Sequence, residues 1–464
     1  MAGKQKQGAE QKLATAKAIY VPWLHMHQPH IWFVYPKNIL NPKRWENESL
    51  IGNLEKMLYE GNYDANKFAM AYANPAKFVT RLREEGFDPK IMLDFSGTLL
   101  ESLERLSQSD DFNNMYVRVD MAGRDEQVGN IIEQYKNALA KYPDAIEFTG
   151  TGFYHPYFPA IPRADWASQI SRWREKFKSL FGEKALLNVK GFWLPEMGIP
   201  GDEGDLFHLI REIKKAGYKW MILPAVENPQ ACPLELPNGE WNRFRIFNEP
   251  HILSASLGGE TESIVAVVRE PGIDHQSGCG AGGVYDKANW VARERAALKA
   301  SVSPALLVPT SDGENGNVMM NQFFFDSFTP FYTNIIDDKV SSLCVSDYLE
   351  GMLKKKLGKV DWARAEEIFS PIKIKKKGGS WIGGHQQWLE GDRRLAIKRK
   401  IDALSERLHK FDKSKGTQAY REAEDAVLNS ETSCYVYWGS DFWFDQGEVS
   451  LKYAEKKIYG LGKP

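Results

Sequence analysis

Apolar and polar positions alternate in blocks along most of the chain. Short apolar runs, which predict strands, lie at 18–24, 91–95, 146–149, 189–194, 220–223, 264–268 and 305–308. The segments between them predict helices at about 54–85, from 99 onward, and at 127–142, 165–181, 205–216 and 287–300, with Asp165 as the cap of the fourth and a Gly-rich loop at 271–283. Strands that alternate with helices favour a parallel sheet, so we expect an α/β fold whose sheet is open or closed into a barrel.

Polar side chains stand at the ends of several predicted strands. These residues are His25 and His27, Asp94, His155, Glu196 and Asp312. Alternation along an extended segment places the first two histidines on one face. In a (β/α) barrel the carboxyl ends of the strands form the active site. Five polar clusters at equivalent places therefore predict an enzyme.

Glu196 has an apolar setting, because Trp193, Leu194 and Met197 flank it. Such burial raises the pKa of a carboxyl or requires a partner, as catalytic carboxyls often do. Glu196 could equally cap the next helix or pair with an arginine. A second carboxylate cluster, Asp312 and Glu314, follows the strand predicted at 305–308 and favours a catalytic pair.

Past residue 328 the alternation of strands and helices stops. Apolar positions at Ile397, Ile401, Leu404, Leu408 and Phe411 predict an amphipathic helix, with 415–429 as its partner. Two aromatic loops interrupt this region, at 378–388 and 431–444. We expect a disordered polar N-terminus over 1–17, a barrel over 18–335, and a helical domain over 336–464 that adds aromatic loops to the cleft.

Composition excludes some classes of protein. A net charge of -1 argues against nucleic-acid binding through phosphate contacts. The four cysteines lack the paired spacing of zinc or redox sites, and no run reaches membrane-spanning length. The first seventeen residues lack the apolar core of a signal sequence, so we expect a soluble cytoplasmic protein without membrane partner or cofactor. The 14 Trp and 19 Tyr could form platforms for sugar rings or fill the core.

The order of the polar clusters resembles glycoside hydrolase family 57. His25 to Pro29 resembles the family's first motif, Phe153 to Pro159 its second in the form with histidine at 155, and Gly191 to Glu196 its third. Ser311 to Glu314 resembles the fourth. The fifth is irregular, with Asp441 in Gly439 to Trp443 or Cys434 as its key residue, and the loop at Trp381 resembles a tryptophan loop over the family's cleft.

The resemblance implies an incomplete seven-stranded (β/α)7 TIM-like barrel followed by a helical region. It implies Glu196 as nucleophile and Asp312 as general acid/base of a retaining enzyme on α-1,4-linked glucans, without a catalytic metal. The implied sugar-binding residues are His25, His27, Gln28, Asp94, His155, Trp193, Glu314, Trp381, Asp441 and Trp443. A retaining pair requires carboxyl groups about 5–5.5 Å apart, with Asp312 protonated while Glu196 is ionised.

Several alternatives stay open at this stage. The same carboxyl pair serves a 4-α-glucanotransferase or a branching enzyme, and the barrel also suits an α-galactosidase. A zinc enzyme could use His25, His27, Asp94 and Asp312 as ligands. A catalytically silent glucan-binding relative is the non-enzymatic reading. Linkage, chain length and oligomeric state do not follow from the sequence.

Overall fold

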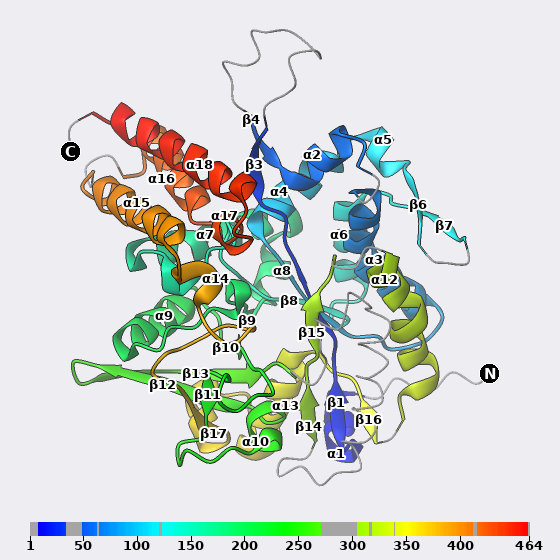
Figure 1. The fold of residues 1–464 in the computed structure, drawn as a ribbon. Helices are drawn as coiled ribbons and strands as arrows, with labels where there is room; N and C mark the ends of the chain where they lie inside the picture. The colour runs from blue at the N-terminus through cyan, green and yellow to red at the C-terminus, as the bar shows by residue number, and fades with distance from the viewer. Residues whose placement is uncertain are drawn as a thin grey trace.

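The computed structural model describes residues 8–33, 49–62, 65–119, 123–270, 304–314, 318–337, 339–411 and 415–462 (Figure 1). The loop expected at 271–283 and the helix expected at 287–300 lie outside the described residues. Within them, helices and mainly parallel strands alternate over the first two thirds of the chain, so the expected α/β class is confirmed. None of the described helices is long and apolar enough to span a bilayer.

The parallel strands near the site form a sheet in the order β15-β2-β5-β8. A larger sheet has the order β11-β17-β12-β13-β10-β9, and a third joins β14, β1 and β16. Their bounds are β1 Ala18–Tyr20, β2 Trp23–Met26, β5 Ile91–Phe95, β8 Ile146–Phe148, β9 Gly191–Phe192, β10 Trp220–Leu223, β11 Leu234–Glu235, β12 His251–Leu257, β13 Glu260–Val268, β14 Ala305–Leu307, β15 Thr310–Asp312, β16 Val340–Ser341 and β17 Ser370–Ile374. Two hairpins lie apart, formed by β3 His30–Phe33 with β4 Ser49–Gly52 and by β6 Tyr116–Arg118 with β7 Asp125–Gln127.

Backbone hydrogen bonds link these sheets at their edges. The Gly150 amide donates to the Gly191 carbonyl at 3.0 Å, and the Trp193 amide donates to the Gly150 carbonyl at 2.7 Å. On another side, the Glu270 amide donates to the Val308 carbonyl at 2.9 Å. The strand ends of the first sheet, of β9 and of β13 therefore face one region.

Proline divides two neighbouring strands that the sequence presents as single runs. Pro22 separates β1 from β2, and Pro309 separates β14 from β15. Proline lacks the amide that a ladder requires, so pairing stops there and each strand changes neighbours. The lower halves, β1 and β14, pair with each other, whereas β2 pairs with β15 and β5. His25 and Asp312 consequently lie within strands rather than after them.

The helices cover the sheets and build the C-terminal region. Along the first half they are α1 Ala9–Thr15, α2 Asn53–Tyr59, α3 Ala65–Glu84, α4 Gly97–Leu106, α5 Asp110–Asn113, α6 Ile131–Lys141, α7 Arg163–Phe181, α8 Glu183–Leu187, α9 Glu203–Lys215 and α10 Arg243–Phe247. Further along they are α12 Val318–Phe323, α13 Val345–Leu357, α14 Gln386–Leu389, α15 Asp392–His409, α16 Gln418–Ser430, α17 Cys434–Tyr437 and α18 Asp441–Gly460, with π-helical turns at Phe324–Phe328 and Phe331–Ile335 and 3-10 turns at Phe158–Ala160, Pro195–Met197 and Trp362–Glu367.

Three local expectations were wrong. The helix expected at 54–85 is two helices, α2 and α3. Asp165 does not cap α7, whose cap is Pro162; it lies buried in the first turn and accepts a hydrogen bond from His409 at 2.7 Å. The N-terminus is ordered from Ala9, because α1 packs on α13 and buries Leu13 and Lys12.

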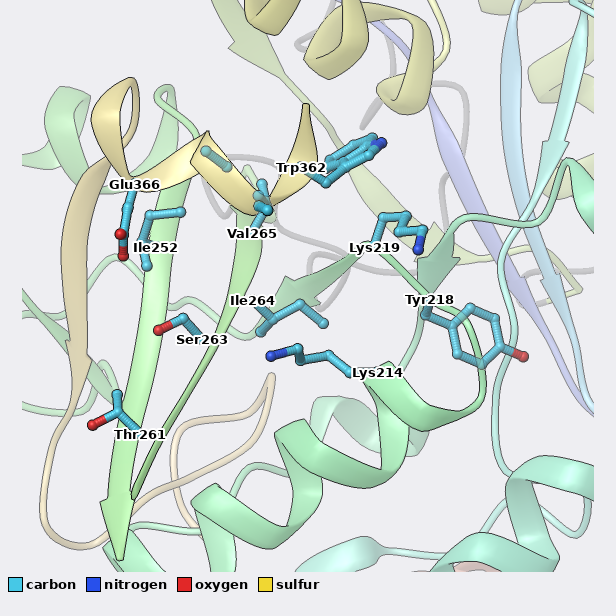
Figure 2. Close-up of a pocket in the computed structure, with 12 residues that line it drawn as sticks. Lys214, Tyr218, Lys219, Ile252, Thr261, Ser263, Ile264, Val265, Trp362 and Glu366 are labelled. Carbon is cyan, nitrogen blue, oxygen red and sulfur yellow. The ribbon is translucent and has the colours of Figure 1, made fainter. Parts of the chain in front are cut away.

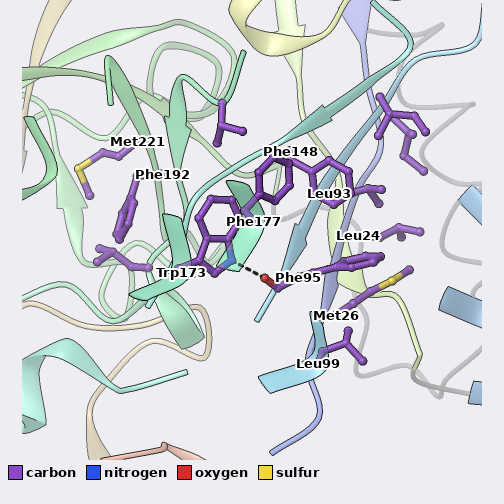
Figure 3. Packing of buried hydrophobic residues seen from close by; sticks show 14 of the residues in the cluster. Leu24, Met26, Leu93, Phe95, Leu99, Phe148, Trp173, Phe177, Phe192 and Met221 are labelled. Atoms are coloured by element: carbon purple, nitrogen blue, oxygen red, sulfur yellow. Dashed lines mark hydrogen bonds between the residues drawn. The ribbon is translucent and has the colours of Figure 1, made fainter. Parts of the chain in front are cut away.

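Aromatic residues join the helices to the sheet in the core (Figure 3). Trp173 of α7 donates its indole N–H to the Phe95 carbonyl at the end of β5, at 2.7 Å. Phe148 of β8 packs edge-to-face against Phe95 and against Phe177 of α7, with ring centroids 5.3 and 5.2 Å apart. This packing fixes α7 beneath the strand ends that carry the polar clusters.

The C-terminal helices α15, α16 and α18 lie side by side (Figure 1, orange to red). Ile397, Ile401 and Leu408 of α15 are buried, as their spacing predicts. The division of the chain near residue 335 stays a prediction. Beyond it, β16 pairs with β1 and β17 pairs with β12, so strands on both sides of this position share sheets.

Candidate active site

A cavity of about 510 Å³ opens at the carboxyl ends of the parallel strands. Its lining combines carboxylates, imidazoles and aromatic rings from both halves of the chain. The lining residues are His25, His27, Gln28, Pro29, Asn53, Met57, Phe68, His155, Glu196, Asp312, Glu314, Trp381, Ile382, Cys434, Tyr437, Trp438 and Trp443.

Most of the site residues expected from sequence line this cavity. Asp94 and Trp193 do not; they are fully buried behind it, where the Trp193 ring stacks on His25 with centroids 5.1 Å apart. Asp441 lies elsewhere, with 92% of its side chain exposed and a 2.6 Å ion pair to Arg393. The alternative position for the fifth motif, Cys434, does line the cavity.

Glu196 follows the short strand β9, in the turn that Pro195 begins. Its φ of 56° and that of Met197, 50°, lie in the left-handed region, as does the φ of His155, 58°. Such conformations cost about 1–3 kcal/mol each and persist only where the surroundings hold them. Among the described non-glycine residues these are the positive φ values, and two of the three residues line the cavity.

Two side chains from the C-terminal region donate to the Glu196 carboxyl. The Ser433 hydroxyl donates to Oε1 at 2.8 Å, and the Trp381 indole N–H donates to Oε2 at 3.1 Å. Ser433 was missed by sequence reasoning. The only signal was its place in the aromatic segment 431–444, because a serine 237 residues distant from its partner leaves no local pattern.

The loop that carries Trp381 is pinned to the turn after Glu196. Ile199 and Gly379 exchange two backbone hydrogen bonds, of 2.9 and 3.0 Å. Gly378 makes this approach possible, since its φ is +63° and a Cβ there would lie 2.3 Å from the Ile199 carbonyl oxygen. The two segments therefore hold the carboxyl and its indole donor together.

Asp312 ends β15, beside His25 in the register of β2. The next residue, Gly313, donates its amide to the His25 carbonyl at 2.6 Å, and a Cβ at Gly313 would lie 2.4 Å from Met26. Glu314 then turns back and accepts the His27 amide on Oε1 at 3.0 Å. Both carboxyls are thereby held against the first motif.

A chain of hydrogen bonds connects Asp94, His25 and His155 to Glu196. Asp94 accepts the Trp23 indole N–H at 3.3 Å and bonds His25 Nδ1 at 2.8 Å. His25 Nε2 lies 3.0 Å from His155 Nε2, and His155 Nδ1 lies 3.0 Å from the Ser433 oxygen. Ser433 completes the connection to Glu196.

His27 lies beside this chain of hydrogen bonds and is not part of it. Its ring stacks on His155, with centroids 3.9 Å apart and planes 8° apart. Its Nδ1 bonds the Ser96 hydroxyl at 2.8 Å, and its Nε2 lies 3.3 Å from the Cys434 sulfur. His25 and His27 thus both face the cavity, as alternation predicts.

Metal binding was one alternative for these histidines. Among the described residues, one group of possible ligands is close enough to hold an ion: donor atoms of His27, His155 and Cys434 lie within 4.8 Å of one another. This group contains neither Asp94 nor Asp312. A metal binds near the plane of an imidazole ring, whereas the His27 and His155 rings stack nearly parallel. Their lone pairs do not converge on one point, so this arrangement disfavours a metal.

Burial dominates the titration of the cavity carboxyls. It raises the pKa of Glu196 to about 7, although the Ser433 hydrogen bond and the charge of His25 oppose the rise. Burial and the charge of Asp312 raise the pKa of Glu314 to about 8. Burial also raises the pKa of Asp312, with His25 and Arg269 opposing.

The histidines divide into one cation and two neutral rings. Burial lowers the pKa of His25, but the charge of Asp94 and its hydrogen bond outweigh burial and raise the value to about 9. Burial lowers the pKa of His27 and of His155 well below the usual range, and the charge of His25 adds to this. At neutral pH the positive charge therefore resides on His25.

Aromatic side chains from the C-terminal region form the outer wall of the cavity. Tyr437, Trp438 and Trp443 line it, and Trp438 is 59% exposed. Their rings can pack on the C–H faces of a sugar. Asn53, Met57 and Phe68 also line the cavity and were not expected there, because the sequences of α2 and α3 resemble ordinary amphipathic helices.

Other cavities differ in chemistry. One of about 420 Å³ lies between the end of α9, β13 and the 362–367 turn, with Lys214, Lys219 and Trp362 at its sides (Figure 2). Its described lining includes one carboxylate, Glu366, and no histidine. A cavity of about 570 Å³ contains the carboxyls Asp144, Glu147 and Asp347 but no histidine in its described lining. Among these three cavities, the first is the one that combines carboxylates with imidazoles.

Comparison with known proteins gives a consistent answer. The family model described as glycosyl hydrolase family 57 matches residues 20–237. No curated protein matches the sequence.

Several solved structures share the fold. The α-amylase AmyC from Thermotoga maritima has a TM-score of 0.60 at 11% identity, over 96% of this chain and 93% of that one. A branching enzyme from Thermococcus kodakaraensis has a TM-score of 0.55 at 15% identity, over 95% and 88%. The 4-alpha-glucanotransferase from Thermococcus litoralis has a TM-score of 0.56 at 14% identity, over 97% of this chain but only 60% of the length of that one.

The matched residues contain the first three of the five polar motifs, and the described fold extends the likeness over nearly the whole chain. The resemblance to glycosyl hydrolase family 57 is therefore confirmed over residues 20–237, just under half of the chain.

Proposed function

We propose that the protein is a retaining glycoside hydrolase that acts on α-1,4-linked glucans. The observation that carries the proposal is the pair Glu196 and Asp312, which come from separate strand ends and line one cavity. Aromatic rings form its outer wall, as a sugar-binding cleft requires. A silent relative is disfavoured because both carboxyls are present in the cavity.

Each carboxyl has a separate role in this mechanism. Glu196 attacks the anomeric carbon and forms a glycosyl ester, while Asp312 gives its proton to the leaving oxygen. Asp312 then takes a proton from the incoming water, which hydrolyses the ester. Burial supports the protonated form of Asp312.

The same burial raises the pKa of Glu196 to about 7, so this carboxyl is only partly ionised at neutral pH. Its two donors, Ser433 and Trp381, favour the ionised form. We infer that the enzyme works at neutral to mildly alkaline pH.

We propose an incomplete (β/α)7 barrel as the scaffold, with 336–464 as a helical region that completes the cleft. The bonds between Gly150 and Gly191 and between Glu270 and Val308 support a continuous ring of parallel strands. Trp381, Tyr437, Trp438 and Trp443 in the cavity support the role of the C-terminal region.

Transfer to a second glucan is the other candidate activity, because the fold is shared with a 4-alpha-glucanotransferase and a branching enzyme. Incubation with linear maltooligosaccharides separates the two. Shorter sugars alone indicate hydrolysis, and a ladder of shorter and longer linear chains indicates transfer. Unchanged substrate, with galactosides also untouched, would overturn the proposed glycosidase.

A further inference from the structure

The three cavity histidines have no ring nitrogen left for a sugar hydroxyl. His25 uses Nδ1 for Asp94 and Nε2 for His155, and His155 uses its Nδ1 for Ser433. His27 uses its nitrogens for Ser96 and Cys434. Their hydrogen-bonding capacity is therefore spent inside the protein, which points to a role other than direct contact with the substrate.

The direction of the chain of hydrogen bonds follows from its two ends, because the Asp94 carboxylate accepts from His25 Nδ1 and the Glu196 carboxylate accepts from Ser433. The positive charge on His25 agrees with this direction. A cationic imidazole donates from both nitrogens, so Nδ1–H points to Asp94 and Nε2–H points to His155. His155 must then accept on Nε2 and carry its own proton on Nδ1, which points to the Ser433 oxygen. The Ser433 oxygen therefore accepts from His155 Nδ1–H, and its O–H donates to Glu196 Oε1.

We propose that His25, which Asp94 holds by its Nδ1–H, begins a hydrogen-bond chain that runs in one direction through His155 and Ser433 to Glu196 and keeps the Glu196 Oε1 oxygen an acceptor. Asp94 and the residues of this chain before Glu196 are positioning residues for the nucleophile, and the sugar is bound by other groups. The inference rests on the proposed role of Glu196 in catalysis. It also explains why Asp94, which does not line the cavity, is fully buried beside the site.

Other charged or titratable groups also face Glu196 and contribute to its ionisation. Trp381 donates to its second oxygen, and Asp312 opposes its charge. Among the described residues, the charge of Glu196 also helps to raise the pKa of Tyr157, Cys434 and Tyr437. None of these stands between Asp94 and Ser433, so a change at Asp94 reaches Glu196 through His25 and the chain.

The direction of the chain can be measured without substrate. In the full-length protein labelled with ¹⁵N-histidine, long-range ¹H–¹⁵N spectra at pH 7 should show His25 protonated on both nitrogens and His155 protonated on Nδ1 only. Spectra of His25→Gln and His155→Gln assign the signals. A His155 proton on Nε2 would mean the opposite direction and would overturn the proposal.

The effect on Glu196 can be measured in the pH profile of kcat/KM. Ser433→Ala removes the donor, so the acid limb should move to higher pH by about one unit. Asp94→Asn should also move the acid limb to higher pH, because without the Asp94 charge His25 is less protonated and no longer lowers the pKa of Glu196. The double variant should move the limb by less than the sum of the two single shifts. A limb at the wild-type position in Ser433→Ala would overturn the proposal.

A matched control is available outside the cavity. Ser346 donates its hydroxyl to Glu147, another buried glutamate, and neither lines the cavity. Ser346→Ala should leave the acid limb of the kcat/KM profile at the wild-type pH. A shift seen in Ser433→Ala but absent in Ser346→Ala is therefore specific to the bond with Glu196. If no glycoside is turned over, titration of ¹³C-carboxyl-labelled protein, with Glu196→Gln to identify the signal, still tests the chain, so its failure and that of the proposed function are distinguishable.

Discussion

Glu196 and Glu147 are two buried glutamates with the same kind of partner and different surroundings. Each accepts a serine hydroxyl, from Ser433 and Ser346 respectively, and burial raises the pKa of both, to about 7 and about 8. Glu147 also accepts the Ser346 amide at 3.0 Å, at the start of α13.

Their differences lie in the backbone conformation and in the neighbouring side chains. Glu147 is within strand β8 and has Asp347 nearby, which raises its pKa further. Glu196 is held in a left-handed turn, is influenced by the cation His25, and lines a cavity that also contains three imidazoles. A raised pKa and a cavity shared with other carboxyls therefore do not by themselves identify a catalytic group, since Glu147 lines a separate cavity with Asp144 and Asp347. The neighbouring imidazoles and the constrained turn distinguish Glu196.

The largest expected difference between the two glutamates is in turnover. Glu196→Gln and Asp312→Asn should each reduce kcat by about 10³-fold or more, because general acid–base or nucleophilic chemistry is lost. Glu147→Gln should retain activity near the wild-type level. Rates on a maltooligosaccharide measure this, and an active Glu196→Gln enzyme would end its assignment as nucleophile.

The second effect is on pH dependence. Glu196 attacks only when ionised, so kcat/KM should fall about tenfold per pH unit below pH about 7, where its carboxyl takes up a proton. The Glu147→Gln enzyme should show the same acid limb. A profile that stays flat down to pH 5 would show that the nucleophile titrates lower than its burial implies.

The third effect concerns the indole donor. Trp381→Phe keeps a ring in the cavity wall but removes the N–H that bonds Glu196 Oε2, so we expect kcat/KM to fall about tenfold. Trp438→Phe is the matched control, since Trp438 lines the same cavity and, among the described contacts, Trp381 is the indole that donates to Glu196. Equal losses in both variants would assign Trp381 a packing role only.

The smallest effect is on stability and concerns Glu147. The folded protein keeps a proton on Glu147 up to pH about 8, whereas the unfolded chain loses it near the ordinary value of 4.5. Because the folded state then binds more protons, the free energy of unfolding declines as pH rises through this interval. In Glu147→Gln this decline should be shallower. Thermal unfolding at pH 5 and pH 8 measures it, and equal slopes would contradict the buried-proton explanation.

Local patterns predicted the strand ends well. His25, Asp94, His155, Glu196 and Asp312 were expected at the ends of parallel strands. His155 and Glu196 follow β8 and β9, whereas His25, Asp94 and Asp312 lie within β2, β5 and β15. All of them except Asp94 line the cavity. The expected α/β class is confirmed, and so is the amphipathic helix at Ile397 to Leu408.

Contacts between distant segments were not predictable. Asp441 looked suitable as an acidic residue in an aromatic loop, but it begins α18 and pairs with Arg393 at the surface. Ser433 had no distinguishing pattern, although it bonds Glu196 directly. Pro22 and Pro309 were visible in the sequence, yet the exchange of strand partners they cause depends on neighbours far along the chain.

The bond between Ser433 and Glu196 has a consequence for biosynthesis. Ser433 follows Glu196 by 237 residues in the sequence, and Cys434 follows its partner His27 by 407 residues. At translation rates of about 5–20 residues per second, Glu196 leaves the ribosome roughly 10–50 s before Ser433 does. During that interval the Glu196 carboxyl lacks the Ser433 donor, so the bond between them forms only after the C-terminal region has been made.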